Sequence, residues 1–130
     1  MKLSNLIGIP FVNKGRDPKL GLDCWGLVIH CYSILKGVQL PDFQICALDS
    51  KKVGDEISYQ CLYGKWNKVE GPETGCVVVI KNHPKIVNHA GLCIDDKTFI
   101  HTLKKTGSVI ERIKHPLWSN RIVGYYRYAG

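Results

Sequence analysis

The sequence predicts an α+β fold in which one strong helix packs against an antiparallel sheet of about five short strands. A single well-capped helical pattern covers residues 24–36, β-branched runs crowd the C-terminal half, and these runs are joined by turns of hairpin length. Helical and strand patterns that are segregated along a chain, with short connections, are typical of α+β domains with antiparallel sheets. The length of 130 residues predicts a single domain spanning residues 1–130.

The helix is predicted from its ends as well as from its periodicity. Asp23 is a good N-cap residue, Gly37 stands where a C′ glycine belongs, and Pro41 follows. Between these ends the apolar side chains recur on one helical face, at Cys24, Leu27, Val28, Cys31 and Leu35. Gly26 in the first turn costs about 1 kcal/mol relative to alanine, so close packing against another segment would explain its presence.

The other segments are assigned in chain order. Residues 1–22 indicate a loop with short helical or strand pieces, and residues 41–74 are ambiguous, although 50–60 could form a second helix. If the ambiguous stretch borders a substrate groove, we expect it to set specificity. After a turn signal at 71–75, strands are predicted at 76–81, 88–94, 98–102, 108–113 and 122–128.

Composition and charge restrict the classes of function. Apolar residues make up 45% and charged residues 22% of the chain, which is usual for a globular protein rather than a disordered or fibrous one. No apolar run approaches the ~20 residues of a membrane span, and no signal-peptide pattern is present, so we expect synthesis in the cytoplasm. The net charge of +7 fits either a solvated basic surface or a polyanionic partner. Nucleic-acid binding is not expected, because the basic residues are dispersed and no recognised motif occurs.

Six cysteines, an even number, raise the question of a disulfide framework. We favour free buried thiols, because the chain is long enough to build its own core and because Cys76 and Cys93 fall within strand-like runs. No two cysteines have the C-x-x-C spacing, so the sequence does not predict a structural zinc site.

Cys24 is the first candidate for chemistry, because it directly follows the N-cap Asp23. The partial positive charge and the unpaired N–H groups of a helix N-terminus favour a thiolate and lower the pKa of a cysteine. The same N–H groups could hydrogen-bond the oxyanion that forms when the sulfur attacks a carbonyl. The alternative is a small apolar residue, buried on the helix face that Cys31 also occupies.

A nucleophilic cysteine needs a base, and His89 and His101 are the histidines placed to supply one. If the two strands around them form a hairpin over a three-residue loop at 95–97, His89 faces Leu103. His101 then lies one diagonal step away on the same face, where it could orient the His89 imidazole. A loop of even length would put the histidines on opposite faces, and each would then be an ordinary surface or core residue.

Three blocks of sequence resemble the NlpC-type cell-wall cysteine peptidases. The blocks are Gly8–Phe11 with Gly15-Arg16-Asp17 and Asp23–Val28, then Asn88–Ile94, then Phe99–Thr102. Trp25, the Gly-Arg-Asp segment and the later Leu40-Pro41-Asp42 are most similar to the phage tail-tip branch of that family. The resemblance implies a papain-like fold, in which the helix presents the cysteine to an antiparallel sheet that carries the base.

The resemblance also implies an activity: a cysteine hydrolase that cleaves peptide bonds in peptidoglycan stem peptides, without a metal or organic cofactor. Cys24 would be the nucleophile, and its backbone N–H would contribute to the oxyanion hole. His89 would be the general base and acid, and His101 would orient it. Asp23 is interpreted as a helix cap rather than a catalytic acid. A tail-tip member would act at the host cell wall as part of the virion tail, with other tail proteins as partners.

Two departures from the family pattern keep an alternative open. Phe11 stands where many members carry a tyrosine whose hydroxyl could assist the oxyanion, and Gly75-Cys76 stands where many carry Gly-Asp. The alternative is a structural tail or wall-binding module of the same fold, with little or no catalysis, held on an anionic partner by the net charge. A third interpretation, acyl transfer or amidase activity on another substrate, would use the same residues.

Overall fold

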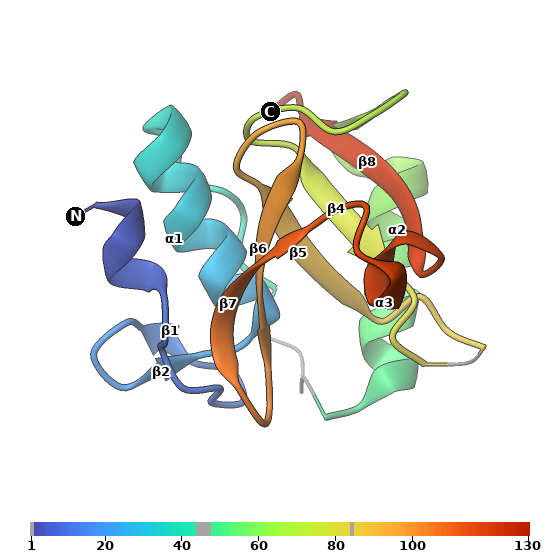
Figure 1. The fold of residues 1–130 in the computed structure, drawn as a ribbon. Coiled ribbons are helices and arrows are strands. Elements are labelled where there is room, and N and C mark those ends of the chain that lie inside the picture. The colour runs from blue at the N-terminus through green and yellow to red at the C-terminus, as the bar shows by residue number, and fades with distance from the viewer. Residues whose placement is uncertain (1, 44–47, 84) are drawn as a thin grey trace.

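The computed structural model describes residues 2–43, 48–83 and 85–130 (Figure 1). Six strands form one antiparallel sheet in the order β3-β8-β4-β5-β6-β7, and β1 and β2 form a separate two-stranded pair. Within the described ranges, no helix has the length and apolar character needed to cross a membrane. The elements are η1 (Leu3–Leu6), β1 (Arg16–Asp17), β2 (Gly21–Leu22), α1 (Cys24–Lys36), α2 (Ser50–Tyr63), β3 (Trp66–Val69), β4 (Val77–Ile80), β5 (His89–Cys93), β6 (Thr98–Leu103), β7 (Gly107–Arg112), α3 (Pro116–Ser119) and β8 (Ile122–Tyr128).

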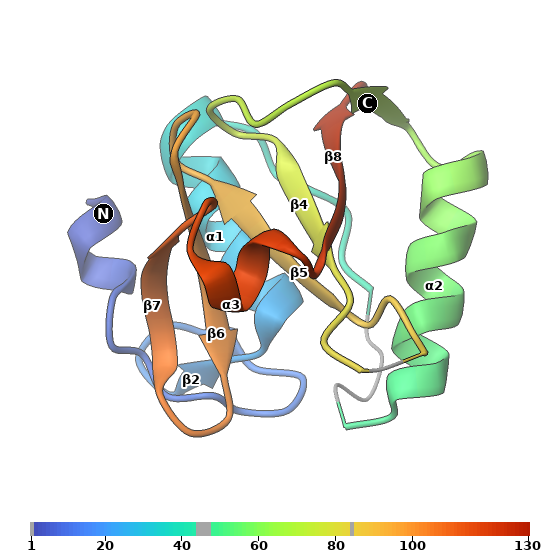
Figure 2. The same ribbon diagram turned by 45° about the vertical axis from the view of Figure 1, so that its right-hand side comes forward.

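The sheet has apolar clusters on both faces. On one face α1 packs mainly against β5 and β6, through a core that includes Leu27, Val28 and Leu92 (Figures 1 and 2). On the other face Phe99 packs with Trp118 of the short helix α3. Helix α2 contacts β3 at one edge of the sheet, and Figure 2 shows it at the opposite end of the molecule from η1. This is the predicted α+β arrangement of a helix on an antiparallel sheet.

Helix α1 begins and ends where the sequence predicts. The side chain of Asp23 accepts a hydrogen bond from the backbone N–H of Gly26 at 2.8 Å, which satisfies one of the free N–H groups of the first turn. Gly37 adopts a left-handed conformation (φ 68°) and donates its N–H to the carbonyl oxygen of Ser33. Glycine suits this position because it has no Cβ to oppose a positive φ.

The structure also explains the glycine in the first turn of α1. A Cβ built on Gly26 would lie 2.3 Å from the carbonyl oxygen of Gly15. The helix therefore touches the backbone of the preceding loop, as the close-packing explanation requires. This contact places the N-terminus of α1 directly against the segment that contains Arg16.

The five predicted strands are confirmed as β4 to β8, each within about two residues of its expected bounds. The sixth strand, β3, was not predicted, because it is short and lies within the ambiguous stretch 41–74. It forms through pairing with β8, in which Trp66 faces Tyr128 and Val69 faces Tyr125. The second helix is confirmed and continues to Tyr63, beyond the expected end at residue 60.

We predict that Gly26→Ala destabilises the protein, although alanine is the better helix former. The added Cβ would collide with the backbone of Gly15, which cannot rotate away as a side chain could. We expect the free energy of unfolding, measured by urea denaturation, to fall by roughly 1–3 kcal/mol. Gly71→Ala is the control, because a Cβ there meets no atom within 4 Å. A Gly26→Ala variant as stable as wild type would refute the contact.

Candidate active site

A buried carboxylate fixes the N-terminus of α1. Asp23 is only 3% exposed, and its Oδ1 accepts hydrogen bonds from the backbone N–H of Gly26 and from Arg16 Nη1, the latter at 2.6 Å. The guanidinium supplies the positive charge that a buried carboxylate requires. Because Cys24 is the next residue, this arrangement sets the position of its sulfur.

The chain that follows α1 is tied to the same place. Arg16 Nε donates to Asp42 at 2.9 Å, and Trp25 Nε1 donates to the carbonyl oxygen of Pro41 at 2.8 Å. Leu40 beside them is 1% exposed and belongs to the core. The Gly15-Arg16-Asp17 segment, Trp25 and the Leu40-Pro41-Asp42 segment are therefore in contact with one another around the first turn of α1.

Cys24 is partly exposed and lies against β5. The backbone N–H groups of Ala90 and Trp25 lie near its thiol and favour the ionised form. Burial raises the pKa of this thiol to about 11, and the negative charge of Asp23 contributes, whereas the two N–H groups and Arg16 lower it. The expectation that the helix N-terminus would give a low-pKa thiolate is therefore wrong for the resting protein, because desolvation outweighs those N–H groups.

The two candidate histidines lie in the predicted register. Strands β5 and β6 pair Leu92 with Ile100, which is the pairing that a three-residue loop at 95–97 produces. His89 Nε2 is 2.9 Å from His101 Nδ1, within hydrogen-bonding distance. His89 is 5% exposed and His101 is fully buried, so solvent does not compete for this contact.

Burial keeps both imidazoles neutral at neutral pH. It lowers the pKa of His89 to about 3, with a further contribution from His101, and it lowers the pKa of His101 to about 4. A neutral imidazole can accept a proton, whereas an imidazolium cannot. The resting site therefore holds a thiol and a neutral imidazole rather than an ion pair.

The three predicted residues are not all bonded to one another. Among residues 2–43, 48–83 and 85–130, the hydrogen bonds join His89 to His101 but do not join the Cys24 sulfur to His89. The thiol lies instead near the backbone N–H of Ala90, the residue that follows His89. A catalytic hydrogen bond that is absent without substrate can form in the complex. Cys24 therefore lies near the strand that carries His89 but makes no hydrogen bond to that imidazole within the described residues.

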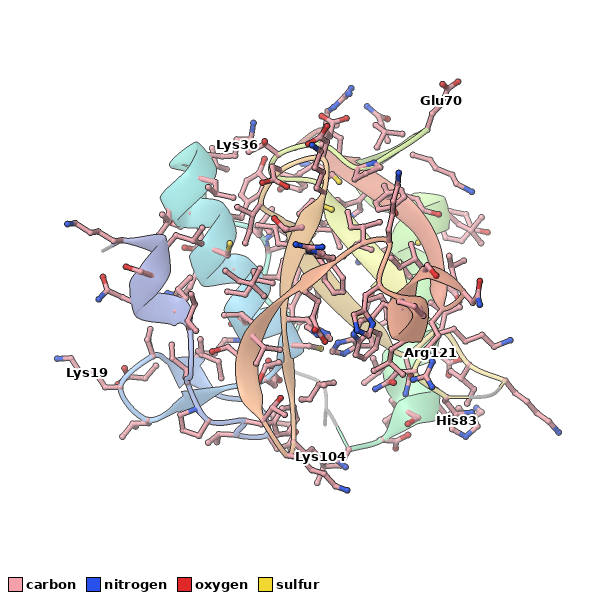
Figure 3. The ribbon with its side chains drawn as sticks, in the orientation of Figure 1. Lys19, Lys36, Glu70, His83, Lys104 and Arg121 are labelled. Atoms are coloured by element: carbon pink, nitrogen blue, oxygen red, sulfur yellow. The ribbon has the colours of Figure 1, made fainter. Side chains whose placement is uncertain are left out.

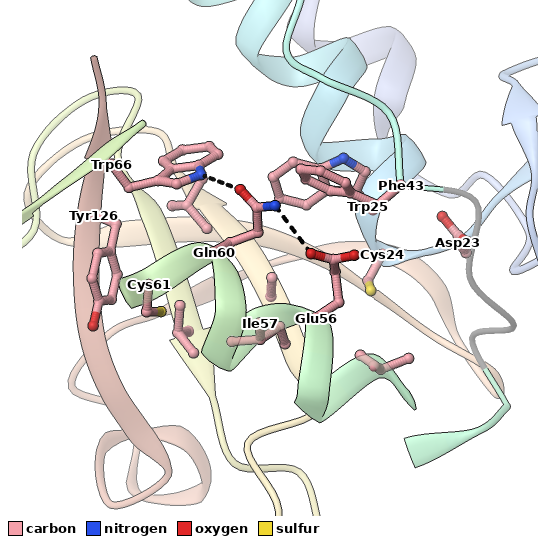
Figure 4. Close-up of a pocket in the computed structure, with 14 residues that line it drawn as sticks. Asp23, Cys24, Trp25, Phe43, Glu56, Ile57, Gln60, Cys61, Trp66 and Tyr126 are labelled. Atoms are coloured by element: carbon pink, nitrogen blue, oxygen red, sulfur yellow. Dashed lines mark hydrogen bonds between the residues drawn. The ribbon is translucent and has the colours of Figure 1, made fainter. Parts of the chain in front are cut away.

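A pocket with mainly apolar and aromatic walls opens at Cys24 (Figure 4). Its side chains come from the first turn of α1, from the sheet and from α2. They include Trp25, Phe43, Ile57, Trp66 and Tyr126. On the α2 side, Trp66 Nε1 donates to Gln60 at 3.2 Å, and Gln60 Nε2 donates to Glu56 at 3.0 Å. The ambiguous stretch 41–74 therefore does border the pocket, although sequence reasoning identified none of these α2 residues.

Glu111 and Trp118, which were also not predicted, lie next to the histidine pair. Glu111 Oε2 is 3.3 Å from His101 Nε2 and accepts a hydrogen bond from Trp118 Nε1 at 2.5 Å. Strands β6 and β7 pair His101 with Val109, so Glu111 is one diagonal step from His101. The same register argument that relates His89 to His101 would have identified it.

The cysteines and the two departures from the family pattern are also placed. Cys46 lies outside the described residues. The described cysteines are all free thiols: Cys24, Cys31, Cys61, Cys76 and Cys93. The buried Cys76 Sγ accepts a hydrogen bond from the N–H of Glu73 at 3.4 Å.

Phe11 forms a β-bridge with Leu22, and its side chain has no hydroxyl that could assist an oxyanion. Across the described parts of the chain, no three side chains gather as a metal site would require.

The profile of the NlpC/P60 family matches residues 8–127. The chain belongs to the NlpC/P60 family. This NlpC/P60 domain is 27% identical over 123 residues to the gamma-DL-glutamyl hydrolase of Bacillus subtilis (strain 168). The alignment covers 94% of the domain and 27% of that relative, so the domain spans about a quarter of the relative's length.

Solved structures of NlpC/P60 proteins share the fold. A lipoprotein-like NLP/P60 protein of Staphylococcus aureus subsp. aureus Mu50 matches with a TM-score of 0.64 at 19% identity, over 96% of this chain and 38% of that one. The NlpC/p60 domain of the peptidoglycan hydrolase SagA matches with a TM-score of 0.61 at 17% identity, over 95% and 91% of the two chains. The papain-like fold implied by the sequence resemblance is confirmed.

We predict that alkylation of Cys24 by iodoacetamide accelerates continuously as the pH rises from about 7 to about 9. The thiolate fraction of a thiol with a raised pKa grows about tenfold per pH unit over that range. Mass spectrometry resolves the rate at each cysteine, and the fully buried Cys31 is an internal control. A Cys24 rate that is already constant below pH 7 would contradict the neutral thiol and indicate a resting ion pair.

We predict that the NlpC/P60 domain loses stability as the pH falls below about 6.5. The pKa of each buried histidine is lower in the folded than in the unfolded chain, so the unfolded chain binds protons first. The stability contributed by the two histidines is complete above pH 6.5 and is lost as the pH falls toward the folded pKa values of about 4 for His101 and about 3 for His89. The loss from His89 alone reaches about 2 kcal/mol at pH 5. Urea denaturation at several pH values measures the loss. His89→Gln should make stability less dependent on pH, whereas the same change at the exposed His83 should leave the dependence unaltered.

Proposed function

We propose that this NlpC/P60 domain is a cysteine hydrolase that cleaves peptide bonds in peptidoglycan stem peptides. The observation that carries the proposal is the placement of Cys24. Its sulfur borders the pocket beside Ala90 of β5, the strand in which His89 pairs with His101. A nucleophile beside a base that is itself oriented by a third group is the arrangement that acyl transfer requires.

The proposed reaction starts from the neutral thiol. Cys24 Sγ attacks the carbonyl carbon of the scissile bond while His89 accepts the thiol proton, and the backbone N–H of Cys24 donates to the oxyanion. Collapse of the intermediate breaks the C–N bond, and the leaving amine takes the proton from His89. Water then attacks the thioester with His89 as base, which releases the carboxylate product and restores the thiol.

The family and the named relatives support hydrolysis of a cell-wall peptide. The Bacillus relative is named a gamma-DL-glutamyl hydrolase, and SagA is described as a peptidoglycan hydrolase. The domain spans only part of the Bacillus relative, so the linkage it cleaves is proposed from the shared domain and not from that whole protein.

We further propose that the domain works in a phage tail, at the host cell wall. The support is the sequence similarity of Trp25, Gly15-Arg16-Asp17 and Leu40-Pro41-Asp42 to the tail-tip branch, and the contacts that join these segments. Basic side chains such as Lys19, Lys36, Lys104 and Arg121 project at separate points of the surface (Figure 3). A dispersed positive charge of this kind suits adhesion to an anionic wall polymer.

We predict that wild-type protein releases fragments from purified stem peptides, and that Cys24→Ala reduces the rate by at least ~10³-fold, because the proposed thioester forms on the Cys24 sulfur. Liquid chromatography with mass spectrometry identifies the products. Cys61→Ala, which removes another thiol that lines the pocket, should stay within a few-fold of wild type.

Unchanged thermal unfolding of Cys24→Ala would show that the loss is chemical rather than structural. Cleavage that survives in Cys24→Ala would exclude the proposed nucleophile. Wild-type protein that cleaves no stem peptide, yet binds purified sacculi in a salt-sensitive way, would favour the wall-binding module instead.

A further inference from the structure

A hydrogen-bonded chain continues from the histidine pair along the same face of the sheet to helix α3. His89 contacts His101, His101 contacts Glu111, and Glu111 contacts Trp118, at 2.9, 3.3 and 2.5 Å. The three strands β5, β6 and β7 each supply one member, and α3 supplies the last. Trp118 is 2% exposed and the Glu111 side chain is 25% exposed, so most of the chain is shielded from water.

The donor and acceptor roles along this chain follow from its outer end. An indole N–H can only donate, and an ionised carboxylate can only accept. Glu111 therefore accepts from Trp118 and also requires a proton on His101 Nε2. A neutral His101 with its proton on Nε2 has an unprotonated Nδ1, which must accept from His89 Nε2. A neutral His89 that donates from Nε2 has an unprotonated Nδ1.

We infer that Glu111 is a positioning residue that fixes the tautomers of both histidines, leaving His89 Nδ1 free to accept the proton of Cys24. The catalytic consequence rests on the proposed function, whereas the tautomers are a property of the resting protein. Glu111 acts through His101 and does not touch the reacting atoms.

The packing around His101 supports a fixed imidazole. The Trp118 and Phe99 rings contact the His101 ring with centroids 4.6 and 4.8 Å away, and the Trp118 ring stands nearly perpendicular to it. Arg121 lies over the Trp118 ring at 5.7 Å. Trp118 thus holds Glu111 through its N–H and packs against His101 through its ring, which restricts both partners of the 3.3 Å contact.

Without Glu111 the chain has a second arrangement. His101 could carry its proton on Nδ1 and donate to His89 Nε2, which would move the His89 proton to Nδ1. A His89 protonated at Nδ1 cannot take the thiol proton at that nitrogen. The carboxylate therefore selects between an arrangement that leaves His89 Nδ1 as an acceptor and one that blocks it.

The test reads the tautomers directly, from the ¹⁵N chemical shifts of the imidazole rings in labelled protein near pH 7.5. In wild type we expect protonated Nε2 and unprotonated Nδ1 on both histidines. Glu111→Leu removes the acceptor, so the His89 Nδ1 signal should move toward the protonated position, and kcat should fall about tenfold or more with little change in KM.

Glu111→Gln should retain the wild-type tautomers. A single oxygen, Oε2, receives both hydrogen bonds, and the amide oxygen of glutamine can take its place. Glu70→Leu is the matched control, because it removes an exposed carboxylate away from the histidines and should change neither tautomers nor kcat.

Two results would overturn the inference: a protonated His89 Nδ1 in the wild type, or unchanged tautomers in a folded Glu111→Leu variant. If that variant does not fold, the wild-type tautomers and those of Glu111→Gln still decide the question. If wild type has the expected tautomers but cleaves no stem peptide, the proposed function fails while the role of Glu111 stands.

Discussion

The candidate active site depends on one buried carboxylate. Asp23 caps α1 through Gly26 and binds Arg16, so a single side chain joins the helix to the loop that precedes it. The same charge has an electrostatic cost, because it helps to raise the pKa of the adjacent Cys24 thiol. Arg16 offsets part of this effect. The site thus combines firm placement of the sulfur with a neutral resting thiol, so the proposed reaction needs a base that takes the proton during attack.

The sheet positions the proposed base, His89, through its register. Successive diagonal steps across β5, β6 and β7 put His89, His101 and Glu111 in one line, and every step uses a three-residue hairpin loop. A slip of one residue in either hairpin would send the next member to the opposite face. The polar chain is therefore specified by backbone hydrogen bonds and turn lengths, which are stronger constraints than the contacts among the polar side chains themselves.

Helix-capping residues and the strand register implied by loop length predicted much of this structure from the sequence. The bounds of α1 followed from Asp23 and Gly37, and the contact of His89 with His101 followed from loop length. The pKa of Cys24 could not be predicted, because burial is set by strands and by α2, which are remote in sequence. Strand β3 forms only because β8 pairs with it. Trp118 reaches Glu111 because α3 packs against that face of the sheet, and no periodicity in the chain encodes such a contact.

Helix α2 is hydrogen-bonded near both of its ends to residues around the pocket and the histidine pair. Near its start, Ser50 accepts a hydrogen bond from Asn88, the neighbour of His89, and near its end Gln60 accepts one from Trp66. Between these ties, Val53, Glu56 and Ile57 border the pocket. Val53 and Ile57 take no part in either tie or in the polar chain of the sheet, so exchange of these two side chains would leave all of them in place. In the proposed enzyme, selection of the substrate can therefore diversify during evolution while the residues proposed to break the bond are inherited unchanged.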